Sequence, residues 1–135
     1  IEKGELPLRV THNDTKLNNV MLDKVTGEPV CVVDLDTVMP GCALYDFGDM
    51  VRTSSAAAAE DEKDLSKVSM DIHLYEKYVK GYLSTAGKSL NEKEIEYLPE
   101  SALILTYECG TRFLADHLDG DVYFKIHKLA GSASF

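Results

Sequence analysis

The stretch that decides the fold of this chain is His12-Asn13-Asp14-Thr15-Lys16-Leu17-Asn18-Asn19, H-N-D-T-K-L-N-N. It is too rich in hydrogen-bonding side chains to be a buried strand or a good helix interior, so we predict a loop. A short apolar run, Leu8–Val10, leads into it, and a second one, Val20–Leu22, follows it. The sequence therefore predicts a polar, functional loop that is held between two short ordered segments.

The spacing within this loop is that of a kinase catalytic loop. The aspartate follows the histidine by two positions, the lysine comes two further on, and the asparagine comes five after the aspartate. Phosphoryl transfer needs an acceptor for the proton of the attacking hydroxyl, a role for Asp14, and a positive charge near the moving phosphoryl group, a role for Lys16. Mg²⁺ prefers hard oxygen ligands, which Asn19 and Asp34 offer. We therefore predict Asp14 and Lys16 as catalytic residues and Asn19 and Asp34 as metal ligands.

A predicted β-hairpin brings Asp34 back to the loop. Val20–Leu22 forms the first strand, Thr26-Gly27 signals a turn, and the β-branched run V-C-V-V-D-L-D over 30–36 forms the second. The stretch Y-D-F-G-D over 45–49 contains the letters D-F-G, which mark the metal-binding aspartate of protein kinases. Asp34 is better placed for that role, because a single tight hairpin separates it from Asn19. For Asp46 we expect a structural role, in which its carboxylate accepts main-chain N–H bonds from the loop.

The remaining chain predicts mostly helices. Met39-Pro40-Gly41 is expected to break the chain, and apolar residues from Val68 to Tyr82 recur at helical spacing up to Gly87. Asn91 and Glu94 have the spacing of a capping box at the start of another helix. From Pro99 to about Leu118 apolar residues occupy two faces, which predicts a central and largely buried helix. The predicted fold class is α+β and mainly helical, with the loop and hairpin in 8–36 and a helical part over about 43–118.

Composition limits the classes of function. The 135 residues suffice for one globular domain, and 14 Lys plus Arg against 23 Asp plus Glu give a formal charge of −9, which disfavours nucleic-acid binding. Three cysteines without close ligand spacing favour neither a disulfide framework nor a zinc site, and we expect them to be reduced core thiols. No apolar run reaches membrane-spanning length, and no signal peptide opens the sequence, so we expect no membrane partner and a cytoplasmic location.

Several motifs together resemble the aminoglycoside phosphotransferase and choline kinase family. They are H-N-D-T-K-L-N-N-V-M-L-D, V-V-D-L-D-T-V-M-P-G, Y-D-F-G-D and G-T-R-F-L-A-D-H-L-D-G-D-V-Y-F, and their combination is most similar to the N-acetylhexosamine 1-kinases. The resemblance implies a protein-kinase-like fold, ATP as co-substrate, Mg²⁺ as cofactor and a sugar as acceptor. It also implies that Asp36, Arg112 and Tyr123 bind the substrate and that His12 orients the loop.

The same resemblance implies that these 135 residues are the C-terminal lobe of the kinase. Kinases of this kind hold the nucleotide with a separate N-terminal lobe, which carries a phosphate loop and a lysine paired with a helix glutamate. That lobe is the expected partner of this chain. Without it, Mg-ATP loses most of its contacts, so the chain alone is expected to be inactive.

Other interpretations stay open at this point. Arg112 lies four residues from both Glu108 and Asp116, so it can equally form a helix-surface ion pair, and Tyr123 can equally be a packing residue. The whole chain can also be a degenerate kinase fold that serves as a binding module, although the intact Asp14, Asn19 and Asp34 argue against this. Similar chains have been labelled mucin-desulfating sulfatases. Sulfatases share a segment of Cys or Ser, any residue, Pro, any residue and Arg, and none of the cysteines here begins one, so this alternative requires a nucleophile outside this sequence.

Overall fold

The predicted hairpin is present in the computed structural model, which describes residues 4–58 and 62–124. Strand β2 (Val20–Leu22) pairs antiparallel with β3 (Pro29–Val32), and Val20 lies opposite Val32. Gly27 adopts a φ of 72° at the tip, a left-handed conformation that glycine reaches without strain. The short 3₁₀ turn η1 (Leu17–Asn19) connects the polar loop to β2, and a second, η2 (Leu35–Thr37), follows β3. The prediction of a hairpin after the loop is confirmed.

The strand before the hairpin pairs with the strand after it, and this pairing corrects one prediction. Strand β1 (Arg9–Thr11) pairs antiparallel with β4 (Met39–Gly41), so that Arg9 lies opposite Gly41 and Val10 opposite Pro40. We predicted a chain break at Met39–Gly41, and this was wrong. A proline lacks the N–H that a central strand needs, but in a ladder of only two strands its missing donor faces outward at no cost.

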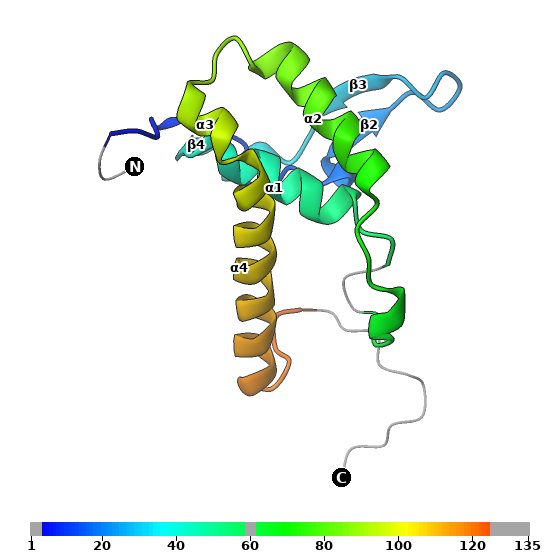
Figure 1. Cartoon of the computed structure of the whole chain (residues 1–135). Coiled ribbons are helices and arrows are strands. Elements are labelled where there is room, and N and C mark those ends of the chain that lie inside the picture. Colours follow the sequence, from blue (N-terminus) through cyan, green and yellow to red (C-terminus); the bar gives the residue numbers. More distant parts are fainter. Residues whose placement is uncertain (1–3, 59–61, 125–135) are drawn as a thin grey trace.

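The helices follow the strands in the chain and form the larger part of the molecule (Figure 1). They are α1 (Ala43–Ser54), the 3₁₀ turn η3 (Leu65–Lys67), α2 (Ile72–Ala86), α3 (Glu92–Glu96) and α4 (Leu98–Leu118). Phe47 and Val51 of α1 are fully buried and form a small core with Cys42, Leu44 and Leu98. The predicted apolar face of α2 packs on this core through residues such as Tyr75, Val79 and Tyr82. The expectation of mixed α and β structure is confirmed.

Helix α1 crosses α4 at a glycine. A Cβ atom built on Gly48 would lie 2.5 Å from the carbonyl oxygen of Ser101 and 2.7 Å from its carbonyl carbon, both in the main chain of α4. No side chain larger than hydrogen fits there unless the two helices move apart. Gly48, the glycine of the D-F-G letters, is therefore a helix-packing residue.

Helix α4 differs from the prediction of a central, largely buried helix. Its buried residues are Leu98, Ser101 and Cys109, whereas Leu103 is 71% exposed and Tyr107 is 80% exposed. Figure 1 shows the reason, because α4 extends away from the point where α1 crosses it. The apolar pattern on two faces was read correctly, but the described residues cover only one of them.

An ion pair joins the first strand to the capping box of α3. The Arg9 Nε and Nη2 atoms donate to the two carboxylate oxygens of Glu94 at 2.6 and 2.7 Å, and Glu94 is completely buried. Glu94 and Asn91 also form the predicted capping box, in which each side chain bonds the other's main-chain N–H. Cys42 and Cys109 are buried as expected, but Cys31 on β3 is exposed, so the prediction of three core thiols was wrong for Cys31. Across residues 4–58 and 62–124, no helix combines the length and apolar character needed to cross a bilayer.

Candidate active site

Asp46 holds the polar loop in place. Its two carboxylate oxygens accept the main-chain N–H groups of His12, at 2.9 Å, and Asn13, at 2.7 Å. Asn13 has a φ of 64°, which lies in the left-handed region. In this conformation the main-chain N–H groups of His12 and Asn13 both point toward helix α1. The Thr15 hydroxyl donates to the main-chain oxygen of Asp46 and adds a third link. The geometry is the one expected for Asp46 as a support of the loop.

Three predicted residues meet at the Asp14 carboxylate. The Lys16 ammonium donates to Asp14 Oδ2 at 2.7 Å, and the Asn19 amide donates to the same oxygen at 2.8 Å and to the main-chain oxygen of Asp14 at 2.9 Å. Asn19 is buried beneath the loop, while Asp14 and Lys16 are partly exposed. The loop thus presents one carboxylate to solvent, fixed by two donors.

These contacts set the protonation states. Burial opposes ionisation of Asp14, but the hydrogen bonds from Lys16 and Asn19 outweigh it, and the pKa of Asp14 is lowered. The hydrogen bond to Asp14 raises the pKa of Lys16, and the nearby charges of Asp34 and Asp49 raise it further. Asp14 is therefore ionised and Lys16 is cationic at neutral pH.

Asp34 lies at the end of the hairpin, close to the loop. The N–H of Val33 donates to the main-chain oxygen of Asn19 at 2.9 Å, and His12 Nε2 lies 3.2 Å from the carbonyl oxygen of Val33. Asp34 itself has a φ of 62° and ψ of 58°, a left-handed conformation that turns the chain sharply after β3. The hairpin therefore brings Val33, the residue before Asp34, back to Asn19. The charge of Asp34 is one of the causes that raise the pKa of Lys16.

The donor set at this point fits Mg²⁺. The Asn19 amide donates its N–H groups to Asp14. Its oxygen forms no hydrogen bond with any described residue, and neither does the exposed carboxylate of Asp34. Amide and carboxylate oxygens are ligands of hard cations, and Mg²⁺ completes such a set with phosphate oxygens and water. Over 4–58 and 62–124 no group of three or more His, Cys, Asp and Glu side chains is arranged to hold a metal.

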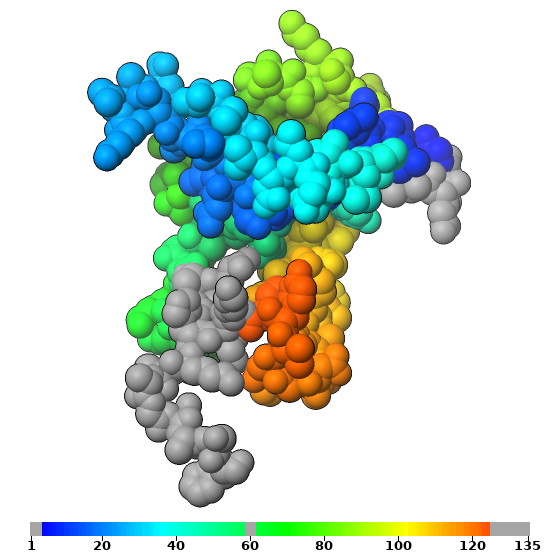
Figure 2. All heavy atoms as spheres, turned by 180° about the vertical axis from the view of Figure 1, so that it is seen from behind, coloured from blue at the N-terminus to red at the C-terminus, as the bar shows by residue number. Residues whose placement is uncertain are grey.

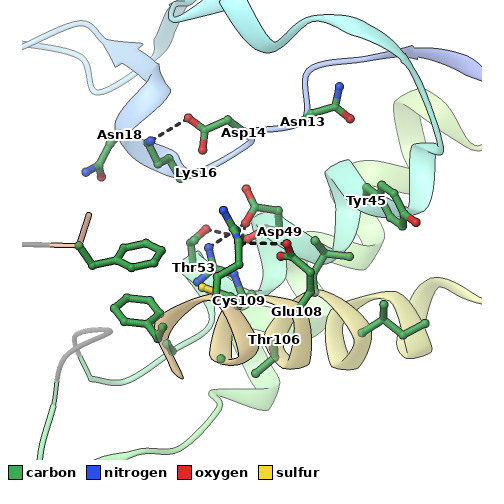
Figure 3. A pocket seen from close by; sticks show the side chains of 18 of the residues that line it. Asn13, Asp14, Lys16, Asn18, Tyr45, Asp49, Thr53, Thr106, Glu108 and Cys109 are labelled. Carbon is green, nitrogen blue, oxygen red and sulfur yellow. Dashed lines mark hydrogen bonds and ion pairs between the residues drawn. The ribbon is translucent and has the colours of Figure 1, made fainter. Parts of the chain in front are cut away.

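A large open pocket lies beside the Asp14 carboxylate. Its volume is about 1160 Å³, and it lies between the polar loop, the second half of α1 and the middle of α4. Figure 3 shows Asp14 and Lys16 on one side of it, with Asp49 and Thr53 of α1 and Glu108 and Cys109 of α4 on the other. Seen from behind in Figure 2, the loop and hairpin lie above, and the segment that follows α4 lies below them. The pocket offers room for a small molecule next to the Asp14 carboxylate.

The residues expected to bind substrate do not all reach this pocket. Arg112 and Tyr123 line it, whereas Asp36 lies exposed in η2 and is not among the lining residues. Arg112 pairs with Glu108 at 2.9 Å, as the ion-pair interpretation expected, while Asp116 is engaged elsewhere. Tyr123 is 79% exposed, so it is not a packing residue of the core.

Sequence reasoning missed some of the residues that line the pocket. Asp49 and Arg52 form an ion pair at 2.9 Å, with only 13% and 16% of their side chains exposed, and Glu108 lies across from them on α4. Asp49 and Arg52 are three residues apart, which is a spacing that favours an ion pair on a helix. Nothing in the sequence indicated that this side of α1 faces Asp14, because that depends on the crossing of α1 and α4.

Loop, hairpin and pocket together define a kinase-type phosphotransferase. Residues 2–87, well over half of the chain, match the sequence profile of the phosphotransferase enzyme family. The chain belongs to the phosphotransferase enzyme family. Membership of this family generally implies ATP as phosphoryl donor and Mg²⁺ as cofactor. The matched region contains the loop, the hairpin, α1 and α2, whereas Arg112 and Tyr123 lie beyond it.

Proposed function

We propose that this chain carries the catalytic loop and acceptor site of a sugar kinase, which transfers the γ-phosphoryl group of ATP to the anomeric hydroxyl of an N-acetylhexosamine. The observation that carries the proposal is the pocket beside Asp14, which is lined by three pairs of opposite charges. The pairs are Lys16 with Asp14, Arg52 with Asp49, and Arg112 with Glu108.

Paired charges favour an uncharged acceptor that is rich in hydroxyl groups. Each pair exposes both donors and acceptors, which suits a sugar hydroxyl, because that group donates and accepts at once. A polycationic aminoglycoside needs a clear excess of carboxylates instead, since each ammonium group must find a partner when it loses water. Among the described residues that line the pocket this excess is small, because Glu62 alone adds a carboxylate to the three pairs.

The reaction follows from the loop. The acceptor oxygen attacks the γ-phosphorus, the bond from that phosphorus to the bridging oxygen of the leaving ADP breaks, and the hydroxyl proton passes to Asp14. Lys16 is placed to offset the negative charge of the transferred group. Asn19 and Asp34 are the residues that would hold Mg²⁺, which when bound supplies charge neutralisation at the nucleotide phosphates.

The proposal includes a nucleotide-binding lobe as partner of this chain. The hairpin supports it, because Met21, Leu22, Val30 and Val32 all keep more than half of their surface exposed. Apolar side chains that gather on one exposed element are typical of a contact surface. The complete protein, meaning this chain together with that lobe, is therefore the form to assay.

The test is an acceptor panel with ATP and Mg²⁺, with the phosphorylated carbon identified by ³¹P NMR. We expect turnover of N-acetylglucosamine or N-acetylgalactosamine and none of choline or kanamycin. Asp14→Ala should lower kcat by about a thousandfold, because proton transfer by a positioned base is worth about 10² to 10⁴. Asp119→Ala is the control, since this exposed carboxylate at the end of α4 lies outside the pocket.

Three results would overturn the proposal. Turnover of choline or an aminoglycoside without hexosamine turnover would refute the acceptor. Full activity of Asp14→Ala would refute the catalytic loop and leave a binding module as the better description. Release of sulfate from a sulfated hexosamine, without any use of ATP, would favour the sulfatase reading.

A further inference from the structure

The carboxylate of Asp116, outside the catalytic loop, accepts hydrogen bonds from the main-chain N–H groups of three consecutive residues. Asp116 Oδ1 accepts the N–H groups of Val122, at 3.0 Å, and Tyr123, at 2.7 Å, and Asp116 Oδ2 accepts that of Phe124, at 2.9 Å. Ordinary helix residues do not form such contacts, because a helix carboxylate usually faces solvent or a side chain one turn away. These bonds therefore fix a segment that lies beyond the helix.

The chain has to reverse direction to reach Asp116. Helix α4 ends at Leu118, Gly120 has a φ of 99° and Asp121 has a φ of 58°, so two successive residues in the left-handed half of φ space turn the chain back. Figure 1 shows the segment after α4 running back beside the end of the helix. The main-chain N–H of Asp121 also donates to the main-chain oxygen of Asp116, at 2.9 Å. Asp116 is thus the point where the returning segment is attached to α4.

The attached segment forms one wall of the pocket. Tyr123 and Phe124 both line it, and the ring of Phe124 stacks on that of Phe113 with centroids 4.0 Å apart and planes inclined by 14°. Tyr123 makes an edge contact with Phe124 at 5.0 Å, and its own N–H is among the three that Asp116 binds. Since Tyr123 is largely exposed, these contacts, and not burial, determine where its side chain lies.

We propose that Asp116 is a positioning residue of the acceptor site, which places Tyr123 at the wall of the pocket by holding the main chain of Val122–Phe124. The inference rests on the proposed function, because it takes Tyr123 as a residue that contacts the sugar. Asp116 itself does not line the pocket and acts only through the segment that it binds. The bonds from Phe124, Tyr123 and Val122 also lower the pKa of Asp116, so the carboxylate stays charged across the usual assay range.

The first measurement is steady-state kinetics of Asp116→Ala in the complete protein. Loss of the three acceptors frees the segment, so we expect the KM for the hexosamine to rise at least about tenfold, as small misplacements of a binding group commonly cost that much. The kcat and the KM for ATP should change by less than about twofold, because the catalytic loop keeps its contacts. Asp116→Asn retains one acceptor oxygen, and it should restore part of the affinity.

A double-mutant cycle tests whether the effect passes through Tyr123. If it does, Tyr123→Ala raises the KM, and adding Asp116→Ala to it raises the KM little further. Fully additive effects would overturn the positioning role. Asp119→Ala is the matched control, three residues along the same helix end, and it should leave every constant unchanged.

Amide hydrogen exchange separates this inference from the proposed function. The N–H groups of Val122, Tyr123 and Phe124 should exchange faster in Asp116→Ala, while those of His12 and Asn13 keep their protection. Unchanged exchange at the first three would overturn the inference and leave the proposed function intact. Absence of hexosamine phosphorylation by the unaltered protein would refute the proposed function and with it the role of Tyr123, even where the exchange results agree. Should Asp116→Ala fail to fold, the partial effect of Asp116→Asn on KM and exchange decides.

Discussion

Adjacent residues in Y-D-F-G-D serve different parts of the molecule. Asp46 binds the main chain of the catalytic loop, Phe47 is fully buried in the core, Gly48 lets α4 approach, and Asp49 forms the ion pair with Arg52 in the pocket wall. On a helix, successive side chains point about 100° apart, so four neighbours face four different surroundings. A single turn of α1 therefore connects the loop, the core, the helix crossing and the pocket.

The pair of Arg9 and Glu94 leads to a pH-dependent prediction. The hydrogen bond from Arg9 lowers the pKa of Glu94 from its ordinary value of 4.5, although burial works against it. A lowered folded-state pKa means that the stabilisation is complete above the ordinary value and is lost as the pH falls through the lowered one. At pH 7, Glu94→Gln should reduce the free energy of unfolding by about 3 kcal/mol, since the Arg9 charge loses its partner.

Denaturant unfolding at a series of pH values checks this prediction. The difference between the unaltered protein and Glu94→Gln should shrink between pH 5 and pH 3. Glu96→Gln is the control, because Glu96 forms an exposed pair with Lys93 at 2.6 Å and exposed pairs contribute little. A difference that stays constant down to pH 3 would show that the charge of Glu94 is not what stabilises the fold.

At the residue scale, the sequence predicted which side chains of the loop meet. The loop spacing identified residues that meet in space, namely Asp14, Lys16 and Asn19, and the role expected of Asp46 agrees with its two main-chain bonds. The sequence did not indicate the ion pair between Arg9 and Glu94, or the hydrogen bonds between Asp116 and the main chain of Val122–Phe124. The first of these pairs is 85 residues apart, and the second depends on a chain reversal at two positive φ values. Spacing alone predicts neither.

Among the elements, the crossing of α1 and α4 is the contact most sensitive to a small change. Gly48→Ala adds one methyl group against the main chain of Ser101, which cannot retreat without moving α4. Helix propensity favours the alanine by about 1 kcal/mol, whereas overpacking of a tight contact costs about 1 to 3 kcal/mol or more. We expect overpacking to dominate and the free energy of unfolding to fall by about 2 kcal/mol.

Gly81→Ala is the matched control for this prediction. Gly81 lies inside α2, and a Cβ atom there meets nothing within 4 Å. Its substitution should raise the free energy of unfolding by about 0.5 to 1 kcal/mol, which is the propensity effect alone. Thermal or urea unfolding measures both variants, and a stabilised Gly48→Ala would mean that the helices are free to move apart.

Elements were predictable where one local rule determined them. A β-branched run and a turn signal determined the hairpin, apolar periodicity determined α2, and the capping box determined the start of α3. Strand β4 was missed because Pro40 and Gly41 carry strong breaker signals, and only the partner strand β1, some thirty residues away in the chain, outweighs them. The exposure of α4 was missed because periodicity shows which faces are apolar and not which of them are covered.

For the whole molecule, we expect the 135-residue chain by itself to show no turnover. The reason is the nucleotide. In the proposed arrangement this chain contacts Mg-ATP only through Asn19, Asp34 and Lys16, and the proposed nucleotide-binding lobe supplies the other contacts. An ADP-release assay with N-acetylglucosamine compares the chain with the complete protein at equal concentration, and circular dichroism confirms that both are folded. Measurable phosphorylation by the isolated chain would contradict this expectation.

The order of features along α1 has a practical consequence for anyone who handles this protein. Its first turn restrains the reactive loop, its middle fills the hydrophobic interior, and its last turns face the cavity in which the acceptor is expected to sit. Heat or denaturant that loosens this one segment should destroy binding, reactivity and compactness in a single event. The activity that remains after warming should then be proportional to the fraction of molecules that are still folded.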